Sequence, residues 1–261
     1  MQKIKAFLKQ FPISYRVNRL IYNLFFRKKI KPYVYKHVNP PADADNETVS
    51  MQKILNILNY MKTSENGFAS QDFPAGYQEI EINGKVFTGT RKPKQRLEKV
   101  PFDFTGKTVL DIGCNHGGMI WALRDKVRWA VGVDINYKFI NAAHVIRAEM
   151  QLNHTNFFVF DADRNPHELL KNYIPEEKVD IVFLLSVCSF IKKWPELINF
   201  CMSISDTMLF EAHGYPDEQQ VQIDYLKKSF KYVKLLSETS DDDERKKNRQ
   251  LFIATNLEQQ F

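Results

Sequence analysis

Residues 108–119 constrain the fold of this chain more than any other segment. Aliphatic and β-branched residues lead to Asp111, a glycine-rich turn follows from Gly113, and an amphipathic helical pattern then begins. This order predicts a buried strand that passes through a tight loop into the N-terminus of a helix. A second strand, residues 130–135, carries Asp134 near its end, close to the spacing of about 20 residues expected of an acid that binds a ribose. The two strand ends predict a nucleoside pocket at the carboxyl edge of a parallel sheet.

The glycine pattern separates two kinds of nucleoside ligand. A dinucleotide site reads Gly-x-Gly-x-x-Gly, whereas here Asn115 stands where the middle glycine would be. Asp111 precedes the first glycine by two positions, and a carboxylate there suits a ligand with an ammonium and a sulfonium better than a pyrophosphate. The pattern therefore disfavours a nicotinamide oxidoreductase.

At these residues the sequence resembles the class I S-adenosylmethionine (SAM) methyltransferases, whose first motif reads acid-x-Gly-x-Gly-x-Gly. The resemblance covers residues 107–256. It implies SAM as the cofactor and S-adenosylhomocysteine (SAH) as the product. Asp134 matches the acid that binds the ribose hydroxyls, and Asp161 the acid near the adenine amino group. The full set of residues that the resemblance assigns to the cofactor is Asp111, Gly113, Asn115, Gly117, Asp134, Ile135, Asp161, Ala162 and Ser186.

Strand and helix patterns alternate beyond residue 107, which is typical of an α/β fold. Strands are expected near residues 108–112, 130–135, 157–162, 179–186 and 207–213. Helices are expected near residues 118–127, 137–151, 165–173, 195–204 and 217–229. Right-handed crossovers then build a doubly wound sheet. Two more strands, near residues 232–237 and 250–255, match the antiparallel last pair of class I methyltransferases, so we predict a Rossmann-like sheet of seven strands with an N-terminal helical and hairpin extension.

The chain divides into four predicted regions. They are a basic amphipathic helical arm (1–36), a linker (37–49), a helix plus β-hairpin lid (50–104) and the SAM-binding methyltransferase domain (105–261). The hairpin depends on Asn83-Gly84, a strong turn signal between alternating strands. The arm is rich in Lys and Arg and has no Asp or Glu. It is expected to cap the catalytic domain, with an anionic membrane surface and nucleic acid as the alternatives.

Composition is that of an ordinary globular protein, with 44% hydrophobic residues and a formal net charge of +6 over 261 residues. The three cysteines have neither paired nor metal-type spacing, so we expect reduced thiols and no metal site. No apolar run approaches the length of a membrane span, and no signal peptide is evident. We predict a cytoplasmic protein, peripheral at the inner membrane face if its arm contacts lipid. Its oligomeric state is not predicted.

Acceptor-side residues should follow the fourth and fifth strands, because ligands of such sheets lie outside the carboxyl ends of the strands. Glu211 and His213 are two apart near the end of the fifth strand and so share a face. An acid beside a histidine predicts a catalytic pair, a general base and the group that orients it. The residues predicted to contact the acceptor are Arg91, Arg96, His116 and Tyr215.

The exit of the fourth strand, residues 186–190, lacks the Asn/Asp-Pro-Pro-aromatic sequence of many enzymes that methylate nucleobase amino groups. Arg91 and Arg96, with the motif that follows them, are similar to enzymes that methylate an RNA 5′ γ-phosphate. The whole chain also resembles methyltransferases of bacterial surface-polysaccharide and capsule clusters. These resemblances imply an O-methyltransferase acting on a small polar or anionic acceptor, either a sugar hydroxyl or a phosphate-type oxygen.

Two alternatives stay open. One is a tRNA or RNA methyltransferase, although the excess charge lies in one terminal arm and nucleic acid is the less favoured partner. The other is a non-catalytic scaffold that keeps the SAM fold and binds partners through residues 1–36.

Overall fold

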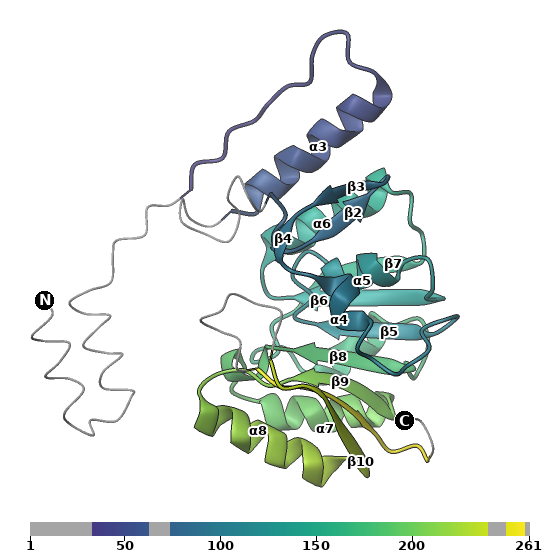
Figure 1. Cartoon of the computed structure of the whole chain (residues 1–261), viewed down its shortest axis with the longest axis vertical. Helices are drawn as coiled ribbons and strands as arrows, with labels where there is room; N and C mark the ends of the chain where they lie inside the picture. The colour runs from purple at the N-terminus through teal and green to yellow at the C-terminus, as the bar shows by residue number, and fades with distance from the viewer. Residues whose placement is uncertain (1–32, 63–73, 240–248, 259–261) are drawn as a thin grey trace, which may run out of the picture.

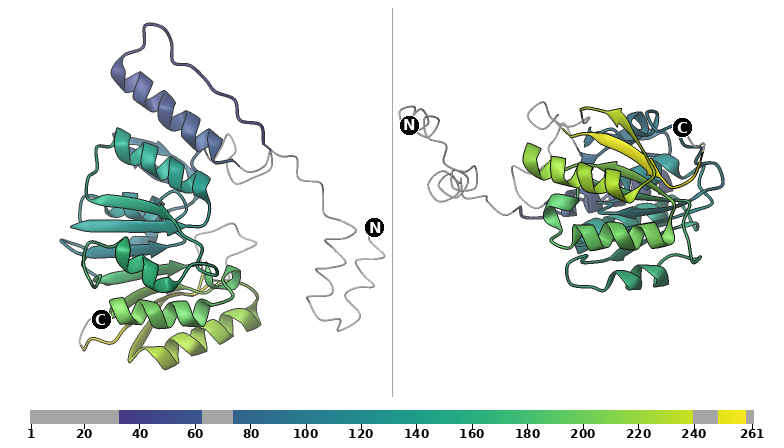
Figure 2. Two further views of the ribbon diagram at one scale, coloured as in Figure 1. Left: turned by 180° about the vertical axis from the view of Figure 1, so that it is seen from behind. Right: turned by 90° about the horizontal axis from the view of Figure 1, so that it is seen from below.

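The computed structural model describes residues 33–62, 74–239 and 249–258. Its main feature is one sheet with helices on both faces (Figures 1 and 2). β11 runs antiparallel to both of its neighbours, and the other neighbouring pairs are parallel. This confirms the predicted seven-stranded sheet with an antiparallel last pair. The strands lie side by side in the order β10 (Tyr232–Ser237), β11 (Leu251–Thr255), β9 (Thr207–Glu211), β8 (Ile181–Leu185), β5 (Thr108–Ile112), β6 (Trp129–Asp134) and β7 (Thr155–Val159).

Helices cover both faces because alternate side chains of each strand point to opposite sides of the sheet. In β5, for example, Val109 belongs to the core of one face and Leu110 to the core of the other. The central strands are buried along their whole length, which explains their continuous aliphatic sequences. Helices α5 (Gly118–Leu123) and α6 (Tyr137–Glu149) pack on the first face. Helices α7 (Trp194–Ile204) and α8 (Pro216–Ser229) pack on the second.

Several elements end earlier than the sequence predicts. The edge strand β7 ends at Val159, which pairs with Asp134, the last residue of its neighbour β6. Asp161 therefore lies in the following loop rather than at the strand end. His213 likewise lies beyond β9. That strand ends at Glu211, its last residue to pair with β8 and β11. The helix predicted over residues 165–173 is a 3₁₀ helix, η1 (His167–Asn172).

The N-terminal extension begins with helix α3 (Asn46–Tyr60), which packs against α6. It starts within the predicted linker because the side chain of Asp45 accepts a hydrogen bond from the backbone N–H of Thr48 (2.8 Å) and so caps the helix. No helix of the described residues is both long and apolar enough to cross a membrane. Most of the predicted basic arm, residues 1–32, lies outside the described residues.

The predicted Asn-Gly hairpin is present, with β2 (Ile80–Ile82) paired to β3 (Lys85–Phe87). Both turn residues have positive φ angles, 49° at Asn83 and 76° at Gly84, as a two-residue hairpin turn requires. β2 contacts helix α5 on the first face of the sheet. Three short elements flank the hairpin and complete the extension: β1 (Gly76–Gln78), β4 (Gly89–Arg91) and α4 (Pro93–Leu97).

Candidate functional site

A cavity of about 670 Å³ opens at the carboxyl ends of the parallel strands, a volume typical of small-molecule sites. Of the residues predicted to bind the cofactor, those that line it are Gly113, Asn115, Asp134, Ile135, Asp161, Ala162 and Ser186. The other two, Asp111 and Gly117, are buried and do not line it. From the extension, residues 75–77 line the cavity, whereas the β2–β3 hairpin that was predicted to cover it does not.

Asp134 is held rigidly at this cavity. Its carboxylate accepts hydrogen bonds from the backbone N–H groups of Asn115 (2.9 Å) and Asn136 (2.8 Å). Burial raises the pKa of Asp134, and these two hydrogen bonds act in the opposite direction. A carboxylate can accept about four hydrogen bonds, so Asp134 retains acceptor capacity for ligand hydroxyls.

The glycine loop contains three residues with positive φ angles, Gly113, Asn115 and Gly117. At Gly113 (φ 79°) a side chain would overlap with Val187 across the cavity wall, so only glycine leaves room there. Gly117 (φ 89°) precedes helix α5 and lies against Phe157 and Trp121. Gly117 is therefore a packing residue of the loop, and the structure does not support its predicted contact with the cofactor.

His116 was predicted to contact the acceptor, but it is fully buried and does not line the cavity. Its ring nitrogen Nδ1 lies 2.7 Å from Oδ1 of Asn115, and its carbonyl accepts a hydrogen bond from the indole of Trp121 (2.7 Å). Burial lowers the pKa of His116 to about 4, so the ring is neutral at pH 7. The loop carries this side chain into the core, and the prediction is corrected accordingly.

Asp111 lies on β5, the strand that leads into the glycine loop, and is almost fully buried. Its Oδ2 atom has no hydrogen-bond partner within the described part of the chain. Burial, with a smaller contribution from the charge of Asp134, raises the pKa of Asp111 to about 7. A buried carboxyl group without a protein partner is costly, and a cationic group of a ligand would offset that cost.

Replacement of Asp111 by Asn tests this interpretation. The folded-state pKa of about 7 lies above the ordinary 3.8, so wild-type stability falls as the pH rises between these values. We expect Asp111→Asn to raise the free energy of unfolding of the ligand-free protein by about 1–3 kcal/mol at pH 8. Denaturant titrations should show a smaller gain at pH 5. Calorimetry should show SAM binding weakened by about 1.5–3 kcal/mol. A variant less stable than wild type at pH 8 contradicts the interpretation.

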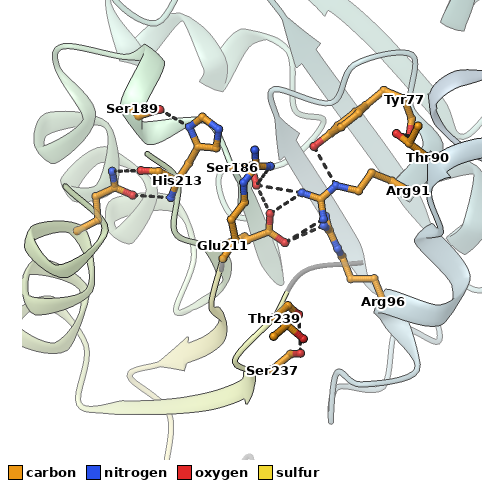
Figure 3. Close-up of polar contacts among 12 residues, drawn as sticks. Tyr77, Thr90, Arg91, Arg96, Ser186, Ser189, Glu211, His213, Ser237 and Thr239 are labelled. Carbon is orange, nitrogen blue, oxygen red and sulfur yellow. Dashed lines mark hydrogen bonds and ion pairs between the residues drawn. The ribbon is translucent and has the colours of Figure 1, made fainter. Parts of the chain in front are cut away.

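Glu211 lies at the centre of a buried cluster of charges (Figure 3). It is 1% exposed and accepts hydrogen bonds from Arg91 (2.8 Å) and Arg96 (2.7 Å), and also from the Ser186 hydroxyl. Burial alone would raise the pKa of Glu211, but the two guanidinium groups outweigh it and hold the pKa below its ordinary value. Arg91 also donates through Nε to the phenol oxygen of Tyr77 (2.9 Å), a cavity-lining residue.

This cluster changes three predicted roles. Glu211 is paired with two arginines, so its lone pairs are engaged and it is a poor base. In Figure 3 its carboxylate points toward Arg91 and Arg96, while the His213 ring points toward Ser189. Neither arginine lines the cavity, and both are buried. The structure therefore shows Arg91 and Arg96 as partners of Glu211, not as a surface that grips the acceptor.

His213 does line the cavity. Its backbone is held by the side-chain amide of Gln222, which accepts a hydrogen bond from the His213 N–H (3.0 Å) and donates one to the His213 carbonyl (2.7 Å). Its ring nitrogen Nδ1 contacts the Ser189 hydroxyl, which helps to orient the ring. Tyr215, a predicted acceptor contact, takes part in the capping box of α8 with Glu218 and does not line the cavity.

Other residues of the cavity wall were not predicted from the sequence, among them Tyr77, Phe190 and Arg249. Phe190 follows the fourth strand at the expected sheet edge, so its position was the available signal. Arg249 donates to the Ser186 hydroxyl (3.3 Å) across a long sequence separation, for which no local pattern exists.

Fold and cavity together define a class of protein, a nucleoside-binding enzyme of the Rossmann-like type. The cavity suits SAM in particular. The carboxylate of Asp134 in the cavity wall has acceptor capacity that suits ribose hydroxyls, and apolar residues of the wall suit an adenine. Asp111 does not line the cavity, but its buried carboxyl group on β5 suits the cationic end of a methionine moiety. Apolar residues of the wall include Ile135, Phe139, Phe160, Ala162 and Ile191.

Comparison with known proteins supports this class. A family of methyltransferase domains matches residues 84–261. A curated relative, the tRNA U34 carboxymethyltransferase of Colwellia psychrerythraea, is 27% identical over 173 residues, which are 59% of this chain and 50% of that protein. The chain thus spans about half the length of this curated relative.

Two solved structures share the fold. The bifunctional kinase-methyltransferase WbdD has a TM-score of 0.57 at 18% identity, covering 77% of this chain and 46% of its own. The N-terminal domain of EvdMO1, crystallised with SAH and D-fucose, has a TM-score of 0.56 at 12% identity, covering 78% and 96%. Because the family match covers more than half of the sequence, the chain belongs to the methyltransferase-domain family. It is a SAM-dependent methyltransferase with the class I fold.

Proposed function

We propose that this enzyme methylates an oxygen of a small polar acceptor, with a sugar hydroxyl favoured over a phosphate-type oxygen. The observation that carries the proposal is His213, a histidine positioned by Gln222 in the wall of the cofactor cavity. A neutral hydroxyl must lose its proton to become a good nucleophile, and a histidine is the usual base near neutral pH. An anionic oxygen would need no such base.

The residues of the chain have separate tasks in this reaction. When bound, SAM supplies an electrophilic methyl group on a sulfonium sulfur. In the tautomer that donates from Nδ1 to Ser189, the Nε2 atom of His213 carries the lone pair that accepts the hydroxyl proton. The new bond joins the acceptor oxygen to the methyl carbon, the sulfur–methyl bond breaks, and its electron pair stays on sulfur. The protein's contribution is to hold the acceptor oxygen in line.

One neighbouring structure supports a sugar acceptor, since the N-terminal domain of EvdMO1 was crystallised with D-fucose. A place in bacterial surface-polysaccharide biosynthesis follows from the resemblance to capsule-cluster methyltransferases and stays a proposal. A cytoplasmic location and the contact of residues 1–36 with an anionic membrane also stay proposals. A nucleic-acid acceptor is the second candidate, favoured by the 27% identity to a tRNA-modifying enzyme.

A panel of acceptors tests the proposal. Full-length protein with SAM is offered methyl glycosides, sugar phosphates and bulk tRNA, and SAH formation is measured for each. We expect turnover with a glycoside or a sugar phosphate, and NMR of the product should show a methyl carbon bonded to oxygen. Methylation of tRNA alone, or of a nitrogen, contradicts the proposal. SAM binding without turnover on any class of acceptor favours the scaffold alternative.

A further inference from the structure

Phe190 is a large apolar side chain in the cavity wall, and 73% of its surface is exposed. Isolated exposed apolar residues are common on proteins, so its exposure alone decides nothing. Its location is informative, because its ring lies beside the ring of His213, with 4.7 Å between the ring centroids and a tilt of 32°. An open aromatic surface therefore adjoins the proposed base.

The chain is built to present Phe190 at this place. Ser186 adopts a positive φ of 59° at the end of β8, and a short 3₁₀ helix, η2 (Cys188–Phe190), follows. Cys188 is fully buried and anchors this helix in the core. Gly214 (φ 108°) lies against Glu218 and Ser189, where a Cβ would be 2.4 Å from the Glu218 carboxylate and 3.2 Å from the Ser189 Cβ. The glycine thus lets the loop of His213 approach η2.

Ile135 provides a contrast within the same cavity. It is also largely exposed, at 63%, but it follows Asp134 directly and so belongs to the part of the cavity that suits the adenosine. Phe190 instead adjoins His213, on the side of the acceptor. The two apolar surfaces therefore serve different parts of the reacting pair.

An aromatic wall beside a base favours an acceptor that has both an apolar face and a hydroxyl. Pyranose sugars carry axial C–H groups on a face and hydroxyls around the edge, and the C–H face packs well on an aromatic ring. A small phosphate-type acceptor has no such face. We propose that Phe190 is an acceptor-binding residue and that the acceptor is a pyranose, stacked on Phe190 with one hydroxyl at His213. This inference rests on the proposed O-methyltransferase function.

Saturation-transfer NMR on the SAH-loaded, full-length protein tests the stacking. The probes are methyl α-D-glucopyranoside, methyl α-D-mannopyranoside, methyl β-D-galactopyranoside and D-fucose. The wild type should saturate the ring C–H protons of at least one probe. Phe190→Ala should weaken that binding about 3- to 10-fold, the range of an aromatic contact. Phe190→Trp should retain it. Val221→Ala removes a comparably exposed apolar side chain from α8, away from the cavity, and should match the wild type.

Two further measurements separate the possible outcomes. SAH affinity is measured for Phe190→Ala by calorimetry, and an equal loss of SAH and glycoside binding would overturn the proposal by making Phe190 a cofactor residue. Unchanged glycoside binding, or no saturation of any probe by the wild type, also overturns it. If sugar phosphates are methylated on the phosphate while glycosides neither bind nor react, this inference fails and O-methyl transfer stands. If only tRNA or a nitrogen is methylated, the proposed function fails as well.

Discussion

Replacement of Glu211 by Gln is expected to lower the free energy of unfolding by about 3–5 kcal/mol, the cost of leaving buried charges without their partner. The reason is that Arg91 and Arg96 are 2% and 7% exposed and both form buried ion pairs with this carboxylate. Denaturant unfolding at pH 7 measures the effect. Glu176→Gln is a matched control, because Glu176 pairs with Arg128 on the surface and its replacement should leave the free energy of unfolding close to that of the wild type.

The difference between wild type and Glu211→Gln should also depend on pH. The folded-state pKa of Glu211 lies below its ordinary value of 4.5, so the carboxylate stabilises the fold above pH 4.5. That stabilisation is lost as the pH falls through the folded-state pKa. The gap between the two proteins should therefore be full at pH 7 and shrink in acid. A loss of less than 1 kcal/mol at pH 7 contradicts the central place of Glu211 in this cluster.

Replacement of His213 by Ala is expected to reduce turnover on a hydroxyl acceptor by about 10²–10⁴-fold, the contribution of a general base. SAM affinity should stay near that of the wild type, because none of the residues that suit the cofactor follows β9, the strand that leads to His213. The rate constant is measured at saturating SAM with the glycoside identified by the acceptor panel. His37→Ala, which changes an exposed histidine remote from this cavity, is the matched control.

Addition of free imidazole distinguishes a base from a positioning residue. If His213 accepts the proton, imidazole should restore part of the turnover of His213→Ala, because it can occupy the space left by the ring. A merely structural role would show no rescue. Turnover of His213→Ala close to the wild-type value would mean that the acceptor oxygen is already anionic, and the base would then be removed from the proposal.

Much of the fold could be predicted because it depends on local sequence patterns. The strands on either side of the glycine loop are recognisable from short aliphatic runs, and the turn at Asn83-Gly84 from two residues. Asp134 could be placed at the cavity because an acid at the end of a parallel strand always meets the carboxyl edge of the sheet. Strand ends were less accurate, since the length of β7 depends on where its neighbour stops pairing.

The contacts of side chains across the sheet edge could not be predicted in the same way. Glu211 and His213 were expected to form a pair because they are two residues apart, yet Glu211 is bound by Arg91 and Arg96, more than a hundred residues earlier in the chain. His116 was expected at the cavity, but the loop directs its side chain into the core instead.

The sequence by itself determined the doubly wound sheet, the glycine loop and the acid Asp134 in the cavity wall, because each depends on residues close together in the chain. Only the tertiary structure decided which charges neutralise one another and which side chains meet in the cavity wall. Arg91 approaches Glu211 through the packing of the extension on the sheet, and Phe190 approaches His213 through two loops that leave different strands. Such side-chain contacts depend on the close packing of distant elements, and no short segment of the sequence predicts them.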